Sequence, residues 1–226
     1  MILGTKNSRN NSHCSLNLRM DGANDGTSFP DSSSFGHTMT RTNALTKTAV
    51  KKFGTASGYF NGSSRLVHAS ANEFNMNTKD FTIEYWAYYS SHTGFILAKG
   101  DGASQGTYQC YNRSTDQYLQ FYLRQASPAV AQAINASVPT NAGDSSWHHI
   151  AFVRDGTNIS VFLDGLLLGQ DAETPIDVDN AGQLNIGVRI WSSSYQLYFT
   201  GYLDSVMLIK NVARYKRNFK VPNRAA

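Results

Sequence analysis

The stretch from residue 147 to residue 169 constrains the fold of this chain more than any other part of the sequence. Asp-Gly pairs at 155–156 and 164–165 separate three runs that are rich in β-branched and aromatic residues. An Asp-Gly pair suits the positive φ angles of a tight hairpin turn, and Ile159 and Val161 fall on one face of the middle run. The segment therefore predicts a three-stranded antiparallel meander.

The same two-residue periodicity marks other strands. In residues 80–89, Phe81, Ile83 and Tyr85 share one face. Glu84 lies on the other face, together with the residues two positions before and two positions after it. The further runs that predict strands are 94–99, 118–124, 183–188 and 196–210. The side chains expected in the protein interior are Phe81, Ile83, Tyr85, Ile150, Phe152, Val161 and Leu163.

Composition narrows the fold class further. Ser, Thr and Asn supply 24, 17 and 19 residues, or 60 of 226, and their side chains compete for backbone hydrogen bonds within helices. Charged residues make up only 16% of the chain, which argues against a coiled coil and a charged disordered protein. Because no Pro-rich or charged linker divides the chain, we expect one all-β domain over residues 1–226, an antiparallel β-sandwich of the jelly-roll type.

Two features bear on location. No apolar run approaches the ~20 residues of a membrane-spanning helix, and the first 11 residues lack the apolar core of a secretory signal. Cys14 and Cys110 are too few for a disulfide scaffold, so both are expected to be reduced thiols. The sequence thus predicts a protein made in the cytoplasm, with no membrane partner.

Charge is distributed unevenly along the chain. All 16 acidic residues lie between Asp21 and Asp204, whereas residues 1–20 carry three cations and residues 205–226 carry six. Basic ends of this kind bind acidic surfaces, whereas nucleic acid is less favoured because no recognition motif accompanies the charge. Two solvated tails are the alternative. The cations that we expect to dock on a partner are Arg214, Lys216, Arg217 and Lys220.

Seven segments of the chain occur in the order of a known family. They are FGTASGYFNGSSRLV (53–67), FTIEYWAYY (81–89), ILAKGDG (96–102), SWHHIAFVRDG (146–156), ISVFLDGLLLG (159–169), LNIGV (184–188) and FTGYLDSVMLIKNVARY (199–215). Together they resemble the laminin-G-like branch of the concanavalin A-like lectin/glucanase domains, over about residues 15–222. The stretches at 18–38 and 211–219 resemble the two ends of versions encoded by tailed bacteriophages. The resemblance implies a jelly roll of two antiparallel sheets, one concave, with the N- and C-terminal strands close together.

Some relatives in that family are glucanases, which need two carboxylates at the scissile bond. A Glu-x-Asp-x-Glu pattern on one strand face is the expected signature, and it is absent because Glu84 stands alone in its strand. The acidic pairs Asp171/Glu173 and Asp177/Asp179 fall in a turn-like stretch and are interpreted as a solvated loop. No catalytic residues are therefore predicted, and the chain is expected not to be an enzyme.

Metal ligation has two candidate positions. Asp31 lies in a loop with several Ser and Asn oxygens, which suits a hard cation such as calcium. Asp204 lies where the resemblance implies a structural calcium in some relatives. Turn formation by Asp side chains is the favoured alternative, so no cofactor is predicted and a structural calcium is left open. His148 and His149 point to opposite faces of a strand and are expected to pack rather than to share an ion.

Carbohydrate recognition is the remaining chemistry, because lectin sites stack aromatic faces on sugar rings. Trp191 and Tyr195, in a Ser-rich stretch, are the favoured ligand-binding candidates. The first hypothesis is nevertheless a non-enzymatic bacteriophage virion protein on the particle exterior, either a capsid decoration protein or a tail-associated protein. Its partners would be the major capsid protein or tail subunits. The alternative is a carbohydrate-binding receptor module of the phage tail that recognises host-surface glycans, and self-association stays open in both.

Overall fold

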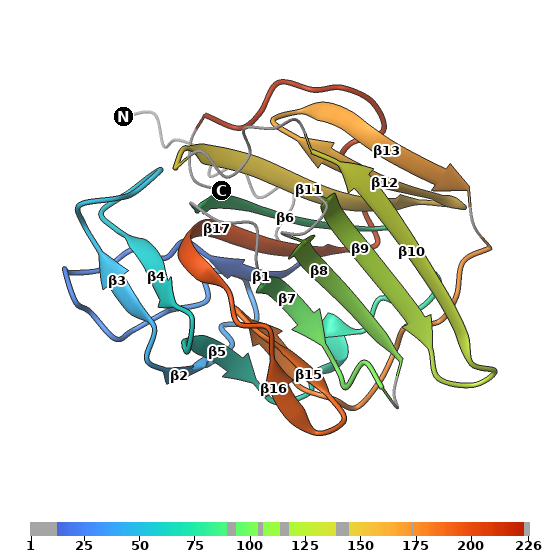
Figure 1. Ribbon diagram of the computed structural model, residues 1–226, viewed down its shortest axis with the longest axis horizontal. Helices are drawn as coiled ribbons and strands as arrows, with labels where there is room; N and C mark the ends of the chain where they lie inside the picture. Colours follow the sequence, from blue (N-terminus) through green and yellow to red (C-terminus); the bar gives the residue numbers. More distant parts are fainter. Residues whose placement is uncertain are drawn as a thin grey trace, which may run out of the picture.

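The computed structural model describes residues 13–89, 94–103, 106–113, 118–138, 145–172 and 174–223. Within them the chain forms two antiparallel sheets that pack face to face, together with a small separate hairpin (Figure 1). Helical structure in these ranges is limited to one 3-10 turn, η1 (Asn72–Phe74). The all-β sandwich expected from the sequence is therefore confirmed.

The first sheet, sheet A, has eight strands. In spatial order they are β13 (Leu166–Ala172), β12 (Asn158–Leu163), β11 (Trp147–Asp155), β6 (Phe81–Tyr88), β17 (Thr200–Lys210), β4 (Ser57–Asn61) and β3 (Leu45–Lys47), with β1 (Cys14–Leu18) also paired to β17. β17 pairs with β4 near its start and with β1 near its end, and a bulge with Ser205 at a φ of 48° lies between the two pairings. The first and last strands are thus neighbours, as the resemblance implies.

The second sheet, sheet B, has seven strands. In spatial order they are β10 (Val130–Ser137), β9 (Tyr118–Gln125), β8 (Thr107–Arg113), β7 (Gly94–Lys99), β14 (Leu184–Ile186), β5 (Arg65–His68) and β2 (Thr40–Thr42). The separate hairpin consists of β15 (Arg189–Trp191) and β16 (Ser194–Gln196) and lies beside β7 (Figure 1).

The core lies between the two sheets. Phe152 of β11 stacks on Phe121 of β9, with ring centroids 5.0 Å apart, so the central strands of the two sheets are in direct contact. All seven side chains predicted to face the interior are at most 6% exposed, namely Phe81, Ile83, Tyr85, Ile150, Phe152, Val161 and Leu163. The strand register inferred from the alternation is confirmed.

Both Asp-Gly turns of the predicted meander are present. Asp164 and Gly165 have φ angles of 49° and 80°, and β12 turns through these two residues directly into β13. Gly156 has a φ of 58° in the turn between β11 and β12. The sequence signal worked here because the residue types tolerate the backbone angles that the turns require.

Both cysteines are buried free thiols, as expected. Burial raises the pKa of Cys14 to about 11 and also raises the pKa of Cys110, so both remain protonated and unreactive near neutral pH. In the part of the chain that the structure describes, no helix is long and apolar enough to cross a membrane.

The C-terminal segment crosses the outer face of sheet A. Residues 211–223, called the C-terminal strap below, follow β17 and pack on β6, β11 and β12. Thr82 Oγ1 donates to the Val212 carbonyl at 2.8 Å. The rings of Tyr215 and Phe219 stack with centroids 3.6 Å apart and pack edge-on against Phe162. The strap therefore removes an apolar part of sheet A from solvent.

Candidate functional site

Glu84 lies at the centre of the face that the strap covers. Arg214 Nη1 donates to one of its carboxylate oxygens, Tyr215 OH donates to the other at 2.7 Å, and His149 Nε2 lies 3.4 Å from that second oxygen. Burial raises the pKa of Glu84, but hydrogen bonding to His149 and Tyr215 and the charge of Arg214 outweigh it, so the pKa lies below its ordinary value. With 3% of its surface exposed, this carboxylate fastens the strap and does not face a substrate.

The other acidic positions weighed for catalysis have local partners as well. Asp177 Oδ1 accepts the Asp179 amide at 2.9 Å, and Asp179 Oδ1 accepts the Asn77 amide at 2.7 Å. These are turn-forming roles. The expectation that Asp171 lies in a turn-like loop is wrong, because β13 extends through it to Ala172, and Glu173 lies outside the described residues.

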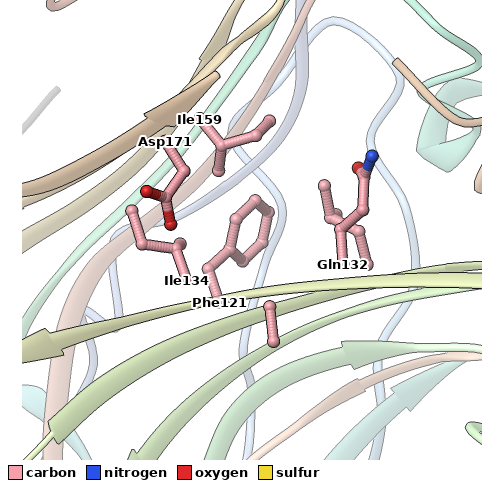
Figure 2. Close-up of a pocket in the computed structure, with 7 residues that line it drawn as sticks. Phe121, Gln132, Ile134, Ile159 and Asp171 are labelled. Carbon is pink, nitrogen blue, oxygen red and sulfur yellow. The ribbon is translucent and has the colours of Figure 1, made fainter. Parts of the chain in front are cut away.

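A narrow cleft lies where β10 and β13 meet at the edge of the sandwich. Figure 2 shows Asp171 and Ile159 from sheet A close to Phe121, Ile134 and Gln132 from sheet B. The cleft holds about 10 Å³, which is room for roughly one water molecule. It is therefore too small to hold a ligand.

The outer face of sheet B is partly exposed. Along β9, Leu119 and Phe121 point into the core, whereas Gln120, Tyr122 and Arg124 point outward and are half-buried. The cross-strand pairs place Tyr122 between Gln109 and Ala133 in one row, and place Gln120 between Tyr111 and Asn135 in the next. Aromatic rings and amides thus alternate over the middle of this face, which is called the sheet B platform below.

The β15–β16 hairpin forms a wall beside the platform. Its tip, Ser192 and Ser193, has φ angles of 49° and 62°, and the Asp101 carboxylate accepts both backbone amides at 3.0 and 2.8 Å. These bonds help hold the pKa of Asp101 below its ordinary value although burial raises it. The hairpin is therefore fixed to the loop that follows β7.

Trp191 packs against the platform. A Cβ atom at Gly102 would lie 2.8 Å from the Trp191 ring and 2.5 Å from Gln109 Nε2, so the absence of a side chain there lets these residues approach. Arg124 Nη1 donates to the Gly102 carbonyl at 2.8 Å. The structure therefore brings Trp191, Gln109 and Arg124 together around one glycine.

Arg189 completes the wall. Its guanidinium lies over the ring of Phe95 at 4.7 Å and over the ring of Trp191 at 4.8 Å, while Phe95 stacks on Tyr111 at 4.2 Å. The ordered stack Tyr111–Phe95–Arg189–Trp191 runs from the platform into the hairpin. Such a stack can bind a flat apolar surface and offer hydrogen-bond donors at its edge.

The two ligand-binding candidates from the sequence both lie in this hairpin, but on opposite faces. Tyr195 pairs with Ile190 and Trp191 pairs with Ser194, so alternation separates the two rings. Tyr195 is 38% exposed and stacks on the guanidinium of Arg65 at 4.1 Å, away from the platform. Trp191 belongs to the candidate site by position, and Tyr195 lies beyond it.

The four candidate docking cations lie on the strap in two different settings. Arg214 is engaged by Glu84, and Lys216 Nζ lies 2.8 Å from Asp155 Oδ1. Arg217 and Lys220 are exposed. Docking of a partner on these residues stays a prediction, and the cations Lys6 and Arg9 that would join them lie outside the described residues.

The two candidate calcium ligands are bonded to the chain itself. Asp31 accepts the amides of Asn17, Ser33 and His37 at 2.8–2.9 Å, and Asp204 Oδ2 accepts the amides of Lys52 and Phe53 at 3.0 Å. Burial raises the pKa of Asp204 to about 6.

No group of three or more His, Cys, Asp or Glu side chains suited to a metal ion occurs among the described residues. His148 Nδ1 lies 2.7 Å from Asp164, whereas His149 faces Glu84, so the two histidines pack separately. Calcium binding by Asp31 or Asp204, which the sequence left open, stays open.

Sequence reasoning missed Arg189, Arg124 and Gln109. The alternation of residues 118–124 could have placed Arg124 beside Tyr122 on an outward face. Arg189 had no such signal, because each strand of the hairpin is only three residues long. Gln109 had none either, because polar residues flank both core positions of β8 and obscure the alternation.

Comparisons with known proteins fit this architecture. The model of the concanavalin A-like lectin/glucanases superfamily matches residues 60–214. The binding domain of Paraclostridial Mosquitocidal Protein 1 is similar with a TM-score of 0.68 and 12% identity, over 90% of this chain and 50% of that one.

The binding domain of botulinum neurotoxin DC in complex with SialylT has a TM-score of 0.63 and 14% identity, over 89% of this chain and 49% of that one. A structure described as showing that cell entry of botulinum neurotoxin type C depends on interaction with two ganglioside molecules has a TM-score of 0.65 and 13% identity. The match covers 89% of this chain and 49% of that one. This chain thus spans about half the length of the solved structures that it resembles. No curated protein sequence matches it significantly.

Proposed function

The chain belongs to the concanavalin A-like lectin/glucanase superfamily, and from that premise we propose that it is a non-catalytic module that binds glycans on the sheet B platform. The family includes both sugar binders and glucanases, so a binding module is distinguished from an enzyme by the residues of the site. Glu84 is buried beneath the strap, and Asp177 and Asp179 have turn-forming roles. Hydrolysis would need two accessible carboxylates, and the described part of the platform offers amides and aromatic rings instead.

The observation that carries the proposal is the place of Tyr122 on the outer face. Its cross-strand partner Gln109 is buried near Trp191 with 1% exposure, and Tyr111 lies in the next row beside the amide of Gln120. Sugar rings present apolar CH faces that stack on aromatic rings, and their hydroxyls pair with amide groups. The platform supplies both kinds of contact on rigid strands, which limits the entropy lost on binding.

A glycan array tests the proposal with two site variants and one matched control. We expect the wild-type protein to bind a defined subset of glycans, and expect Tyr122→Ala and Trp191→Ala to lose at least about 1 kcal/mol of binding free energy each. Tyr202→Ala, an aromatic change on sheet A near Tyr59, should bind as the wild type does. Equal loss in all three variants, or binding by none of the proteins, would refute the proposed site.

We also propose that the module is carried on the exterior of a bacteriophage particle. This setting is supported by the resemblance of residues 18–38 and 211–219 to the ends of phage-encoded versions. A capsid decoration protein and a tail-associated protein both fit, and glycan binding is compatible with either. Arg217 and Lys220, the exposed cations of the strap, are the residues through which we expect docking on an acidic neighbour.

Quantitative mass spectrometry of purified particles tests this setting. A decoration protein should be present in high copy number and a tail protein in low copy number. Replacing Arg217 and Lys220 with Ser should lower occupancy, and the difference from the wild type should be largest at low salt, because salt screens exposed charges over about 8–10 Å. Absence of the protein from particles would contradict the virion role, and unchanged occupancy would contradict docking through the strap.

A further inference from the structure

Resting on the glycan-binding function proposed above, we infer that the sheet B platform selects carboxylated saccharides and that Arg189 binds the carboxylate. The inference goes beyond the proposed function because it names the chemical class of the ligand and the residue that distinguishes it from neutral sugars.

The first step is the unusual environment of Arg189. Its guanidinium is half-buried between Phe95 and Trp191, its Nε atom is buried without a hydrogen-bond partner, and its Nη2 atom makes one long bond of 3.4 Å to Gln196 Oε1. No carboxylate within the described ranges forms an ion pair with it. Partly burying a cation without a counter-ion is costly, so a site of this kind favours an incoming anion.

The second step is the charge around Arg189. Arg124 lies on the same platform, and the nearby Asp101 is occupied by the amides of Ser192 and Ser193 at the hairpin tip. The outward positions of β8 and β9 whose side chains are described include no acidic residue. The charges of Asp101 and Arg124 interact, so Arg189 supplies the net positive charge of these positions, which suits a ligand with negative charge.

The third step is the kind of anion. A guanidinium can donate two parallel bonds along one edge, and a carboxylate accepts two such bonds side by side. A nucleic acid would also stack on aromatic rings, but its binding relies on a series of cations along the backbone. Here two arginines lie near the amides of Gln120 and Asn135, which bond to each other at 2.6 Å and suit sugar hydroxyls, whereas Gln109 is buried. Uronic and sialic acids combine one carboxylate with such hydroxyls.

The test compares matched pairs of ligands by titration calorimetry. The pairs are sialyllactose with its methyl ester, and an oligogalacturonate with its methyl ester, so that each pair differs chiefly in the carboxylate. The proteins are the wild type, Arg189→Met, Arg189→Lys and the control Arg217→Met on the strap. Thermal unfolding of each variant verifies that it is folded before binding is measured.

We expect the wild type and Arg217→Met to bind the acidic member of at least one pair about tenfold more tightly than its neutral partner. Arg189→Met should abolish that preference and leave the affinity for the neutral member within about twofold. Arg189→Lys keeps the charge but loses the planar fork, so it should keep only part of the preference. If Arg189→Met does not fold, the reduced preference of Arg189→Lys decides the matter.

Equal binding of both members by the wild type would overturn the inference and leave the glycan-binding function standing. The same holds if Arg189→Met weakens both members equally, because Arg189 would then support the hairpin alone. Binding of no saccharide, or tighter binding of an oligothymidylate than of any saccharide, would refute both the inference and the proposed function.

Discussion

Replacing Arg214 with Met removes the cation from the buried carboxylate of Glu84 and should loosen the C-terminal strap. The side chain of Arg214 is 32% exposed, whereas Glu84 is almost fully buried. A hydrogen bond to a charged group contributes about 1.5–3 kcal/mol, and stripping a buried charge of its partner costs about 3–5 kcal/mol. Because Tyr215 and His149 still contact Glu84 after the change, we expect the lower range, about 1.5–3 kcal/mol.

Urea unfolding followed by tryptophan fluorescence measures this loss. Trp86 lies beside His149, with ring centroids 5.3 Å apart, so a fluorophore reports on this face of the sheet. Arg214→Met, Glu84→Gln and the double variant form a cycle whose coupling energy should reach about 0.5–3 kcal/mol. Arg217→Met, on the same strap, should stay within about 0.5 kcal/mol of the wild type. A loss for Arg214→Met no larger than that of Arg217→Met would refute the role given to Glu84.

Three further predictions concern the core, the strap and acid pH. Phe152→Ala, at a side chain with no solvent exposure that stacks on Phe121, should cost about 3–5 kcal/mol in the same unfolding assay. Gly165→Ala places a Cβ atom 2.1 Å from the Phe219 carbonyl oxygen at a φ of 80°, so limited proteolysis should cleave the strap faster than in the wild type; an unchanged rate would contradict the close contact. The pKa of Glu84 is lowered in the folded protein, so its stabilisation is complete above the unfolded pKa of 4.5 and is lost as pH falls through the folded value. Glu84→Gln should therefore flatten the fall of unfolding free energy below about pH 4.5, and a slope equal to that of the wild type would contradict this assignment.

The sequence predicted those parts of the fold where local preference and burial agree. The meander of β11, β12 and β13 has Asp-Gly turns and alternating apolar residues, so its register followed directly. The strands β2, β3 and β15 are only three residues long. A segment of three residues has too few positions for alternation to be recognised.

The candidate site was predicted in part, for a related reason. Trp191 was recognised because an aromatic residue in a Ser-rich stretch suggests an exposed ring. Tyr195 points away from the platform because of the strand pairing within the hairpin. The Asp101 carboxylate helps to fix the hairpin by accepting the amide of Ser192, 91 positions further along the sequence. The strap cations illustrate the same limit, since Arg214 meets Glu84 across 130 positions. Contacts of such long range are set by the topology and leave no local signal.

The central claim is that ligands bind on the sheet B platform, and amide chemical-shift mapping tests it most directly. The isotopically labelled protein would be titrated with the strongest ligand from the glycan array. The account predicts saturable shifts confined to β8, β9 and the β15–β16 hairpin, centred on Tyr122 and Trp191. Saturable shifts centred instead on the C-terminal strap or on the outer face of sheet A would contradict it.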